Sequence, residues 1–162
     1  MPHPLAEALV ALLAARRLTL ALAETDTGGL IGSALTDVPG SSAVFLGGVT
    51  PYHNAPKRRL LHVPAELLES HGAVSEEAVR AMALGLRRAF ACEIALAESG
   101  ITGPSGGTPD RPVGTVWIAC LGPGHRFVAQ RHVWAGDREA NKRSTLERAL
   151  YLILEAAQAA PS

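Results

Sequence analysis

Two hydrophobic patterns alternate along this chain: short apolar runs of strand length, and longer segments with apolar residues every three or four positions. The short runs predict strands over Leu18–Ala23, Val44–Thr50 and Glu93–Ala97, followed by a hairpin of two strands over Val113–Leu121 and Phe127–Trp134. The helical spacing predicts helices over Leu5–Ala15, Leu30–Asp37, Pro64–His71, Ser75–Phe90 and Glu139–Ala159, with a further short helix opening within residues 52–59.

The order of these elements predicts the fold class. Strands that alternate with helices favour an α/β domain, here a three-layer α/β/α sandwich with a mixed, mostly parallel sheet. The hairpin around Gly122–Gly124 requires at least one antiparallel pair of strands. With 162 residues and no internal repeat, we expect residues 1–162 to form a single domain.

Composition narrows the possible partners and location. Fifteen basic and fifteen acidic residues cancel, which argues against a nucleic-acid or anionic-membrane partner. No apolar run reaches membrane-spanning length and the chain lacks the basic start of a secretory signal, so we expect a cytoplasmic protein. The six histidines lack metal-ligand spacing, and Cys92 and Cys120 lie far apart in apolar contexts, so we expect neither a metal nor another cofactor. Outer helices rich in Leu and Ala would permit a homo-oligomer.

The segment Leu18–Ser33 carries the first candidate chemistry. A strand there turns through Thr25 and Thr27 into Gly28 and Gly29 and continues as a helix. Backbone N–H groups at such a helix start suit an anion or a developing oxyanion, and the Thr25 hydroxyl sits at the elbow. The alternative is an ordinary strand-to-helix turn in which Thr27 is the N-cap and the glycines serve only the bend.

Other polar segments also follow predicted strands. Tyr52 and Lys57 lie in the loop after the second strand, a long glycine-rich loop spans Gly100–Gly114, and Arg138 stands at the start of the last helix. Clefts of open α/β folds form at the carboxyl ends of strands, so these segments can meet there. These residues could also have no role in a binding cleft, since Lys57 could lie on a solvated helix face and Arg138 could be an ordinary first-turn residue.

Several spaced motifs resemble one family over nearly the whole chain. Ala23–Gly29 resembles the A-E-S-C-T-G-G motif of the CinA C-terminal domain family, the nicotinamide mononucleotide deamidases, and His71–Glu76 is its H-G-A-V-S-E unchanged. The further matches are Asp37–Ser42 with D-x-x-G-S-S, Gly48–Lys57 with G-V-x-x-Y-S-N-x-x-K, Ser99–Gly107, Arg111–Val116 and Gly136–Arg138.

This resemblance implies hydrolysis of the carboxamide of nicotinamide mononucleotide to the acid and ammonia, in pyridine-nucleotide salvage and without a metal. It places Thr25 at the nucleophile position, Lys57 at the base position and Tyr52 at that of the nearby tyrosine. The residues expected to bind the nucleotide substrate are Thr27, Gly28 and Gly29, whose segment would stabilise the oxyanion, and Ser99, Gly100, Gly106 and Arg138, with Arg138 on the phosphate.

The chain departs from the family pattern at its most sensitive positions. Thr25 replaces the serine, Asp26 replaces the cysteine, and His53 and Ala55 replace Ser and Glu of the tyrosine motif. The methyl group of Thr25 restricts its rotamer, and the Asp26 charge could keep Lys57 protonated. Three hypotheses therefore stay open: an amidohydrolase that uses Thr25, an impaired relative that binds a nucleotide as a sensor or competence/damage-related interaction module, and an amidase with another substrate.

Overall fold

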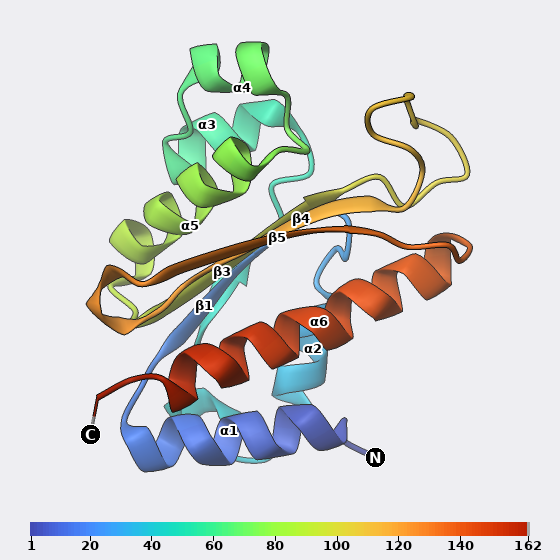
Figure 1. Ribbon diagram of the computed structural model, residues 1–162. Coiled ribbons are helices and arrows are strands. Elements are labelled where there is room, and N and C mark those ends of the chain that lie inside the picture. The colour runs from blue at the N-terminus through green and yellow to red at the C-terminus, as the bar shows by residue number, and fades with distance from the viewer. Residues whose placement is uncertain (162) are drawn as a thin grey trace.

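A five-stranded sheet in the order β2-β1-β3-β4-β5 forms the centre of the computed structural model, which describes residues 1–161 (Figure 1). Its strands are β1 (Leu20–Glu24), β2 (Phe45–Val49), β3 (Ile94–Gly100), β4 (Thr115–Leu121) and β5 (Phe127–Val133). The helices are α1 (Pro4–Arg16), α2 (Leu30–Thr36), α3 (Asn54–Leu61), α4 (Ala65–His71), α5 (Glu76–Phe90) and α6 (Arg138–Gln158), with 3₁₀ turns at Ser41–Ala43 and Pro123–His125.

The two faces of the sheet bury side chains of different size. Leucine and isoleucine of the central strands, such as Leu22 and Leu96, pack against α1, α2 and α6. The opposite face presents alanines, including Ala21 and Ala95, to α5 and to the neighbouring α3 and α4. Figure 1 shows these helices in two layers on either side of the strands, so the expected α/β/α layering is confirmed.

The sheet is mixed, as expected, but the expectation of a mostly parallel sheet is corrected. β1 pairs in parallel with both β2 and β3, whereas β3 with β4 and β4 with β5 are antiparallel, so the pairings divide evenly. The hairpin adds its first strand antiparallel to β3, which supplies the second antiparallel pair. The predicted strand over Val44–Thr50 is β2, an edge strand whose residues alternate between half-buried and exposed.

Chain order reverses direction at β1, and this reversal positions the site. The chain passes from β1 to β2 on one side and then returns to β3 on the other side of β1. Loops that leave adjacent parallel strands in opposite directions open a crevice at their carboxyl ends. β3 also runs three residues further than predicted, through Glu98, Ser99 and Gly100, which pair with β4.

Candidate active site

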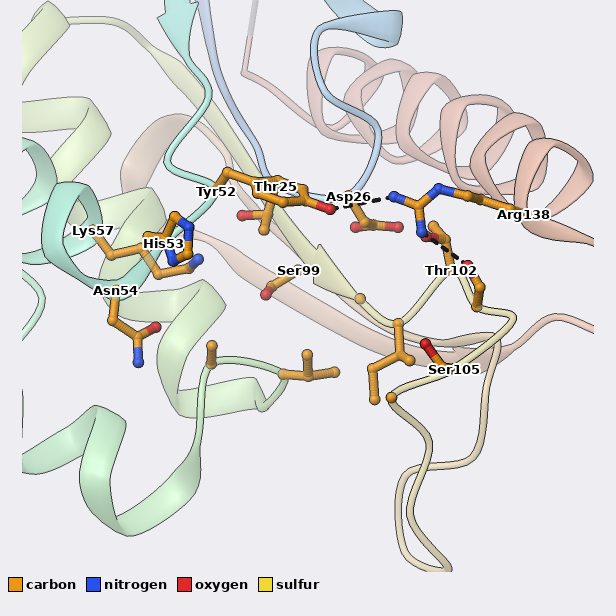
Figure 2. Close-up of a pocket in the computed structure, with 16 residues that line it drawn as sticks. Thr25, Asp26, Tyr52, His53, Asn54, Lys57, Ser99, Thr102, Ser105 and Arg138 are labelled. Carbon is orange, nitrogen blue, oxygen red and sulfur yellow. Dashed lines mark hydrogen bonds between the residues drawn. The ribbon is translucent and has the colours of Figure 1, made fainter.

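A cleft of about 440 Å³ opens at the carboxyl ends of β1, β2 and β3. The structure brings seven of the ten predicted site residues to its wall, and they are Thr25, Tyr52, Lys57, Ser99, Gly100, Gly106 and Arg138. Figure 2 shows the five labelled side chains among them entering the cleft from the turn after β1, the loop after β2, α3, β3 and α6. Segments more than 100 residues apart in sequence, from Thr25 to Arg138, therefore meet in one concave space.

Lys57 is buried although it carries an amine. Its side chain is only 1% exposed, and its Nζ donates one hydrogen bond, of 2.8 Å, to the Pro51 carbonyl. Burial lowers the pKa of Lys57 to about 8, while the negative charge of Asp26 acts in the opposite direction. The solvated-face alternative for Lys57 is therefore wrong, and an amine that loses its proton near neutral pH faces the cleft.

Thr25 and Asp26 contribute two unpartnered oxygen atoms to the cleft that Lys57 lines. Both residues are more than nine-tenths buried, and Thr25 Oγ1 and Asp26 Oδ1 have no hydrogen-bond partner among the described residues. Burial raises the pKa of Asp26 to about 6, against the opposing effects of its own backbone amide, Lys142 and Arg138. Buried polar atoms left without partners are rare in proteins and indicate a place where a ligand atom can bind.

Arg138 closes the cleft on the side of α6. Its guanidinium donates one hydrogen bond of 2.8 Å to the Gly103 carbonyl and another of 3.2 Å to the Tyr52 hydroxyl (Figure 2). Tyr52 is 57% exposed, so this contact spans the cleft at its mouth. Arg138 is thus more than a first-turn helix residue, because it ties the glycine-rich loop and the loop after β2 together.

Asn141 holds the same loop through two hydrogen bonds, a role that was not predicted from the sequence. Its amide nitrogen donates to the Thr102 carbonyl at 3.1 Å, and its amide oxygen accepts from the Gly136 N–H at 3.0 Å. The only signal for this role was a polar residue at a position of the final helix that faces the protein interior.

Thr27, Gly28 and Gly29 lie outside the cleft lining, unlike the expectation that they contact substrate. The Gly29 N–H donates to Glu24 at 3.1 Å, and the Thr27 N–H donates to Glu98 at 3.1 Å. These donors are therefore already used by buried carboxylates. Thr27 is also not the N-cap of α2, since that position belongs to Gly29, which has no side chain to cap the helix.

Glu24 and Glu98 hold the turn that carries Thr25, a role that was not predicted from the sequence. Both are buried at the ends of β1 and β3, where they are paired in register, and both accept hydrogen bonds from the Thr25–Gly29 turn. The available signal was an acidic residue at the end of each apolar strand run, in Leu20–Glu24 and Ile94–Glu98.

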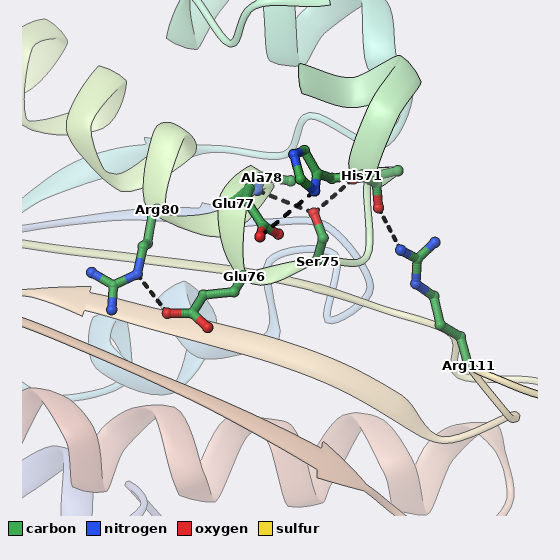
Figure 3. A network of polar contacts seen from close by, with 8 residues as sticks. His71, Ser75, Glu76, Glu77, Ala78, Arg80 and Arg111 are labelled. Atoms are coloured by element: carbon green, nitrogen blue, oxygen red, sulfur yellow. Dashed lines mark hydrogen bonds and ion pairs between the residues drawn. The ribbon is translucent and has the colours of Figure 1, made fainter. Parts of the chain in front are cut away.

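The H-G-A-V-S-E segment builds the wall opposite α6 (Figure 3). Ser75 caps α5 by accepting a hydrogen bond of 3.2 Å from the Ala78 N–H, and its hydroxyl donates to the Gly72 carbonyl at 2.8 Å. Arg111, from the glycine-rich loop, donates to the His71 carbonyl. This motif holds Ala73 and Val74 against the cleft, so its role here is structural.

In the described range, residues 1–161, no helix is both long and apolar enough to cross a membrane. Within the same range, no three histidine, cysteine or acidic side chains gather closely enough to hold a metal ion.

We expect Lys57→Met to leave the free energy of unfolding unchanged or to raise it by about 1 kcal/mol, because it removes a buried amine with a single partner. Urea unfolding of the variant measures this, with Arg58→Met on the exposed face of α3 as the matched control. A loss of several kcal/mol in Lys57→Met alone would contradict the expectation, because it would mean that the amine holds α3 in place.

Comparison with known proteins identifies the family and supports the fold. The family model of the CinA C-terminal domain matches residues 2–157. A CinA-like protein of Parasynechococcus marenigrum is 52% identical over 147 residues, which are 90% of this chain and 35% of that protein. The chain thus spans about a third of the length of the curated relatives it matches.

Two solved structures share the fold over nearly their whole length. A competence-damaged protein (CinA) superfamily protein from Klebsiella pneumoniae is 35% identical with a TM-score of 0.90, and the match covers 95% of this chain and 96% of that one. A competence/damage inducible protein from Agrobacterium tumefaciens is 32% identical with a TM-score of 0.89, over 96% of this chain and 98% of that one. The chain belongs to the CinA C-terminal domain family.

Proposed function

We propose that this protein is an amidohydrolase that cleaves the carboxamide of nicotinamide mononucleotide to give nicotinate mononucleotide and ammonia. The observation that carries the proposal is Lys57, a buried amine with a pKa of about 8 in the same cleft as the unpartnered Thr25 hydroxyl. A hydroxyl becomes an effective nucleophile when a neighbouring base takes its proton. The family resemblance supplies the substrate, and the cleft supplies a nucleophile and a base.

The reaction divides into acylation of Thr25 and hydrolysis of the resulting ester. Neutral Lys57 takes the proton of Thr25 as Oγ1 bonds to the carboxamide carbon, and the resulting ammonium returns a proton to nitrogen as the C–N bond breaks. Ammonia leaves and an ester with Thr25 remains. Water then attacks that ester with Lys57 again as base, which releases the acid and restores the Thr25 hydroxyl.

Three N–H groups of the turn after β1 are not available to stabilise the oxyanion. The N–H groups of Asp26, Thr27 and Gly29 are bonded to buried carboxylates and cannot turn toward a substrate. Ser99 also lines the cleft, at the carboxyl end of β3, where its hydroxyl can donate a hydrogen bond. We assign Ser99 as the side-chain donor to the carboxamide oxygen.

The phosphate end of the substrate lies toward α6 in this proposal. Arg138 offers a planar guanidinium suited to bidentate contact with phosphate. Gly106 of the glycine-rich loop has a φ of +94° and lines the same cleft, so its backbone N–H is a candidate second donor to the phosphate. Lys142, one helical turn after Arg138, adds a second positive charge near Asp26.

A second candidate, an impaired relative that binds a nucleotide without hydrolysing it, is favoured by one observation. The negative charge of Asp26 raises the pKa of Lys57 against the effect of burial, which reduces the fraction of neutral base. In that case the cleft would act as a nucleotide sensor or as part of an interaction module. A homo-oligomer is compatible with either function.

Variants of Thr25 test the nucleophile. We expect Thr25→Ala to abolish ammonia release with little loss of stability, and Thr25→Ser to retain or raise the rate because the crowding methyl is gone. If Asp26 has silenced the site, Thr25→Ser alone will change little, and Thr25→Ser combined with Asp26→Cys will restore activity. Ammonia and acid product measured with purified protein and nicotinamide mononucleotide separate the cases. Full activity in Thr25→Ala would refute a covalent step.

Asp26→Asn tests how its charge controls Lys57. Removing the negative charge lowers the pKa of Lys57 below about 8, so the rising limb of the pH–rate profile should move to lower pH. At pH 7 the rate gains at most about tenfold, since neutral lysine is roughly a tenth of the total at one unit below its pKa. A limb that stays fixed or moves to higher pH would show that Lys57 is not the titrating base.

Arg138→Ala tests phosphate recognition. We expect it to weaken binding of nicotinamide mononucleotide at least about tenfold while free nicotinamide is affected far less, because only the nucleotide carries a phosphate. Titration calorimetry with both ligands measures the difference. Arg143→Ala, at an exposed position of α6, is the control, since among residues 1–161 the Arg143 side chain pairs only with Glu139. Equal losses for both ligands would mean that Arg138 supports the loops, not the phosphate.

A further inference from the structure

Two buried glutamates share one hydroxyl group beneath the Thr25 elbow. Thr27 Oγ1 lies 2.7 Å from Glu24 Oε2 and 2.6 Å from Glu98 Oε1. All three residues are at most 4% exposed, so no water competes for these contacts. Both distances are those of short hydrogen bonds between oxygen atoms.

Counting hydrogens shows that one proton is missing if both carboxyl groups are ionised. A threonine hydroxyl has a single hydrogen and can donate to only one acceptor with good geometry. The other contact would then bring a lone pair of Thr27 to within 2.7 Å of an ionised carboxylate, without a hydrogen between them. A second short contact is satisfied only when one carboxyl group carries a proton and donates it to Thr27.

The backbone identifies Glu24 as the ionised partner. Its Oε2 already accepts from the N–H groups of Gly29 at 3.1 Å and Ile31 at 2.9 Å, and its Oε1 accepts from the Gly32 N–H at 2.8 Å. An oxygen that faces two N–H donors and a hydroxyl has no room for a proton of its own. The positive end of the α2 dipole further favours the anion.

Glu98 has the weaker set of donors. It accepts from the N–H groups of Thr27 at 3.1 Å and Asp26 at 3.3 Å, one on each oxygen. We infer that Glu98 carries a proton at neutral pH and donates it to Thr27, whose hydroxyl in turn donates to ionised Glu24. The chain of donors runs Glu98 Oε1–H to Thr27 Oγ1–H to Glu24 Oε2, and the buried pair bears one negative charge.

Neither glutamate forms an ion pair with a cation among residues 1–161. α2 and β4 contain no acidic or basic side chain, and β2 contains none either. Asp26 lies in the same turn, and the positive charges of Lys142 and Arg138, from α6, act to lower its pKa. A second anion here would add to the charge of Asp26.

The proton makes Glu98 a positioning residue for the proposed reaction. Glu98 holds the N–H groups of Asp26 and Thr27, and so fixes the turn that presents Thr25. Loss of its proton would place a second negative charge beneath the carbon at which an oxyanion forms, and would help to keep Lys57 protonated. Only this activity consequence rests on the proposed function, since the proton itself is a property of the protein alone.

Matched glutamine variants test the assignment without substrate. Glu98→Gln replaces a protonated carboxyl by a neutral amide that still donates to Thr27 and loses one backbone contact, so Tm should fall by no more than about 4 °C. Glu24→Gln turns an amide NH₂ toward the donors of α2 and should lower Tm by at least about 6 °C. Glu147→Gln, at an exposed position of α6, is the control. Equal losses for both buried variants, or a greater loss for Glu98→Gln, would overturn the assignment.

Infrared spectra observe the proton directly. At about pH 8, Asp26 is ionised because its pKa is about 6, so the shared proton is the one carboxyl proton expected among residues 1–161. We expect a protonated-carboxyl C=O band in the wild type and in Glu147→Gln that is absent from Glu98→Gln. No such band in the wild type would refute the proposal, whatever the protein's activity.

The pH dependence of stability gives an independent measurement. Above about pH 5 the folded wild type binds one proton that the unfolded chain, with an ordinary glutamate, has released. The free energy of unfolding must therefore fall with rising pH until Glu98 ionises in the folded state, and this slope should be missing from Glu98→Gln. The titrations of Asp26 and Lys57 occur in both proteins and largely cancel in the comparison. Identical slopes would contradict a proton on Glu98.

Discussion

The carboxylate of Glu24 is the contact on which the geometry of the cleft depends. It stands at the end of β1 and accepts hydrogen bonds from the Thr27 hydroxyl and from the N–H groups of Gly29, Ile31 and Gly32. It thereby replaces the N-cap side chain that α2 lacks, and its negative charge interacts favourably with the positive end of the helix dipole. Strand and helix are joined by one side chain, so the residues between them have a defined position. The same contact removes those N–H groups from any role toward a substrate.

The face of small residues decides how Lys57 reaches the cleft. Alanines of the central strands let α5 approach the sheet closely, and Gly85 of α5 lets α3 approach in turn. A Cβ atom at Gly85 would lie 1.9 Å from the Leu61 carbonyl oxygen, so only glycine permits this distance. Since Lys57 and Leu61 are one turn apart on α3, the close packing of two helices positions an amine that burial has made less basic. Burying the Lys57 amine, which favours its neutral form, lowers the stability of the folded protein.

Local patterns in the sequence were sufficient to predict most elements and the place of the cleft, but not the contacts that depend on pairing. Apolar periodicity gave each helix and strand to within a few residues, and polar residues after strands indicated one edge of the sheet. β3 was predicted to end before Glu98, because its last residues are polar and their pairing with Ile118, Trp117 and Val116 is not visible locally. The bridge from Thr27 to Glu98 spans 71 residues and exists only through the register of β1 with β3. A turn that resembles an ordinary N-cap in sequence is therefore organised by a distant acid.

The charge of Asp26 reduces the fraction of neutral Lys57 too little to abolish hydrolysis by itself. With a pKa of about 8, Lys57 is neutral in roughly one molecule in ten at pH 7, which costs a base-catalysed step about tenfold, or about 1.4 kcal/mol. Enzymes lower reaction barriers by about 8–23 kcal/mol, so this loss leaves most of such an effect intact. A protein that binds the nucleotide without hydrolysing it would need a larger defect in catalysis. The Thr25 methyl group restricts χ1 at the attacking atom, and it is the remaining difference from the family motif that acts directly on the nucleophile. The decision between hydrolysis and binding therefore rests on the rotamer of Thr25 more than on the charge beside it.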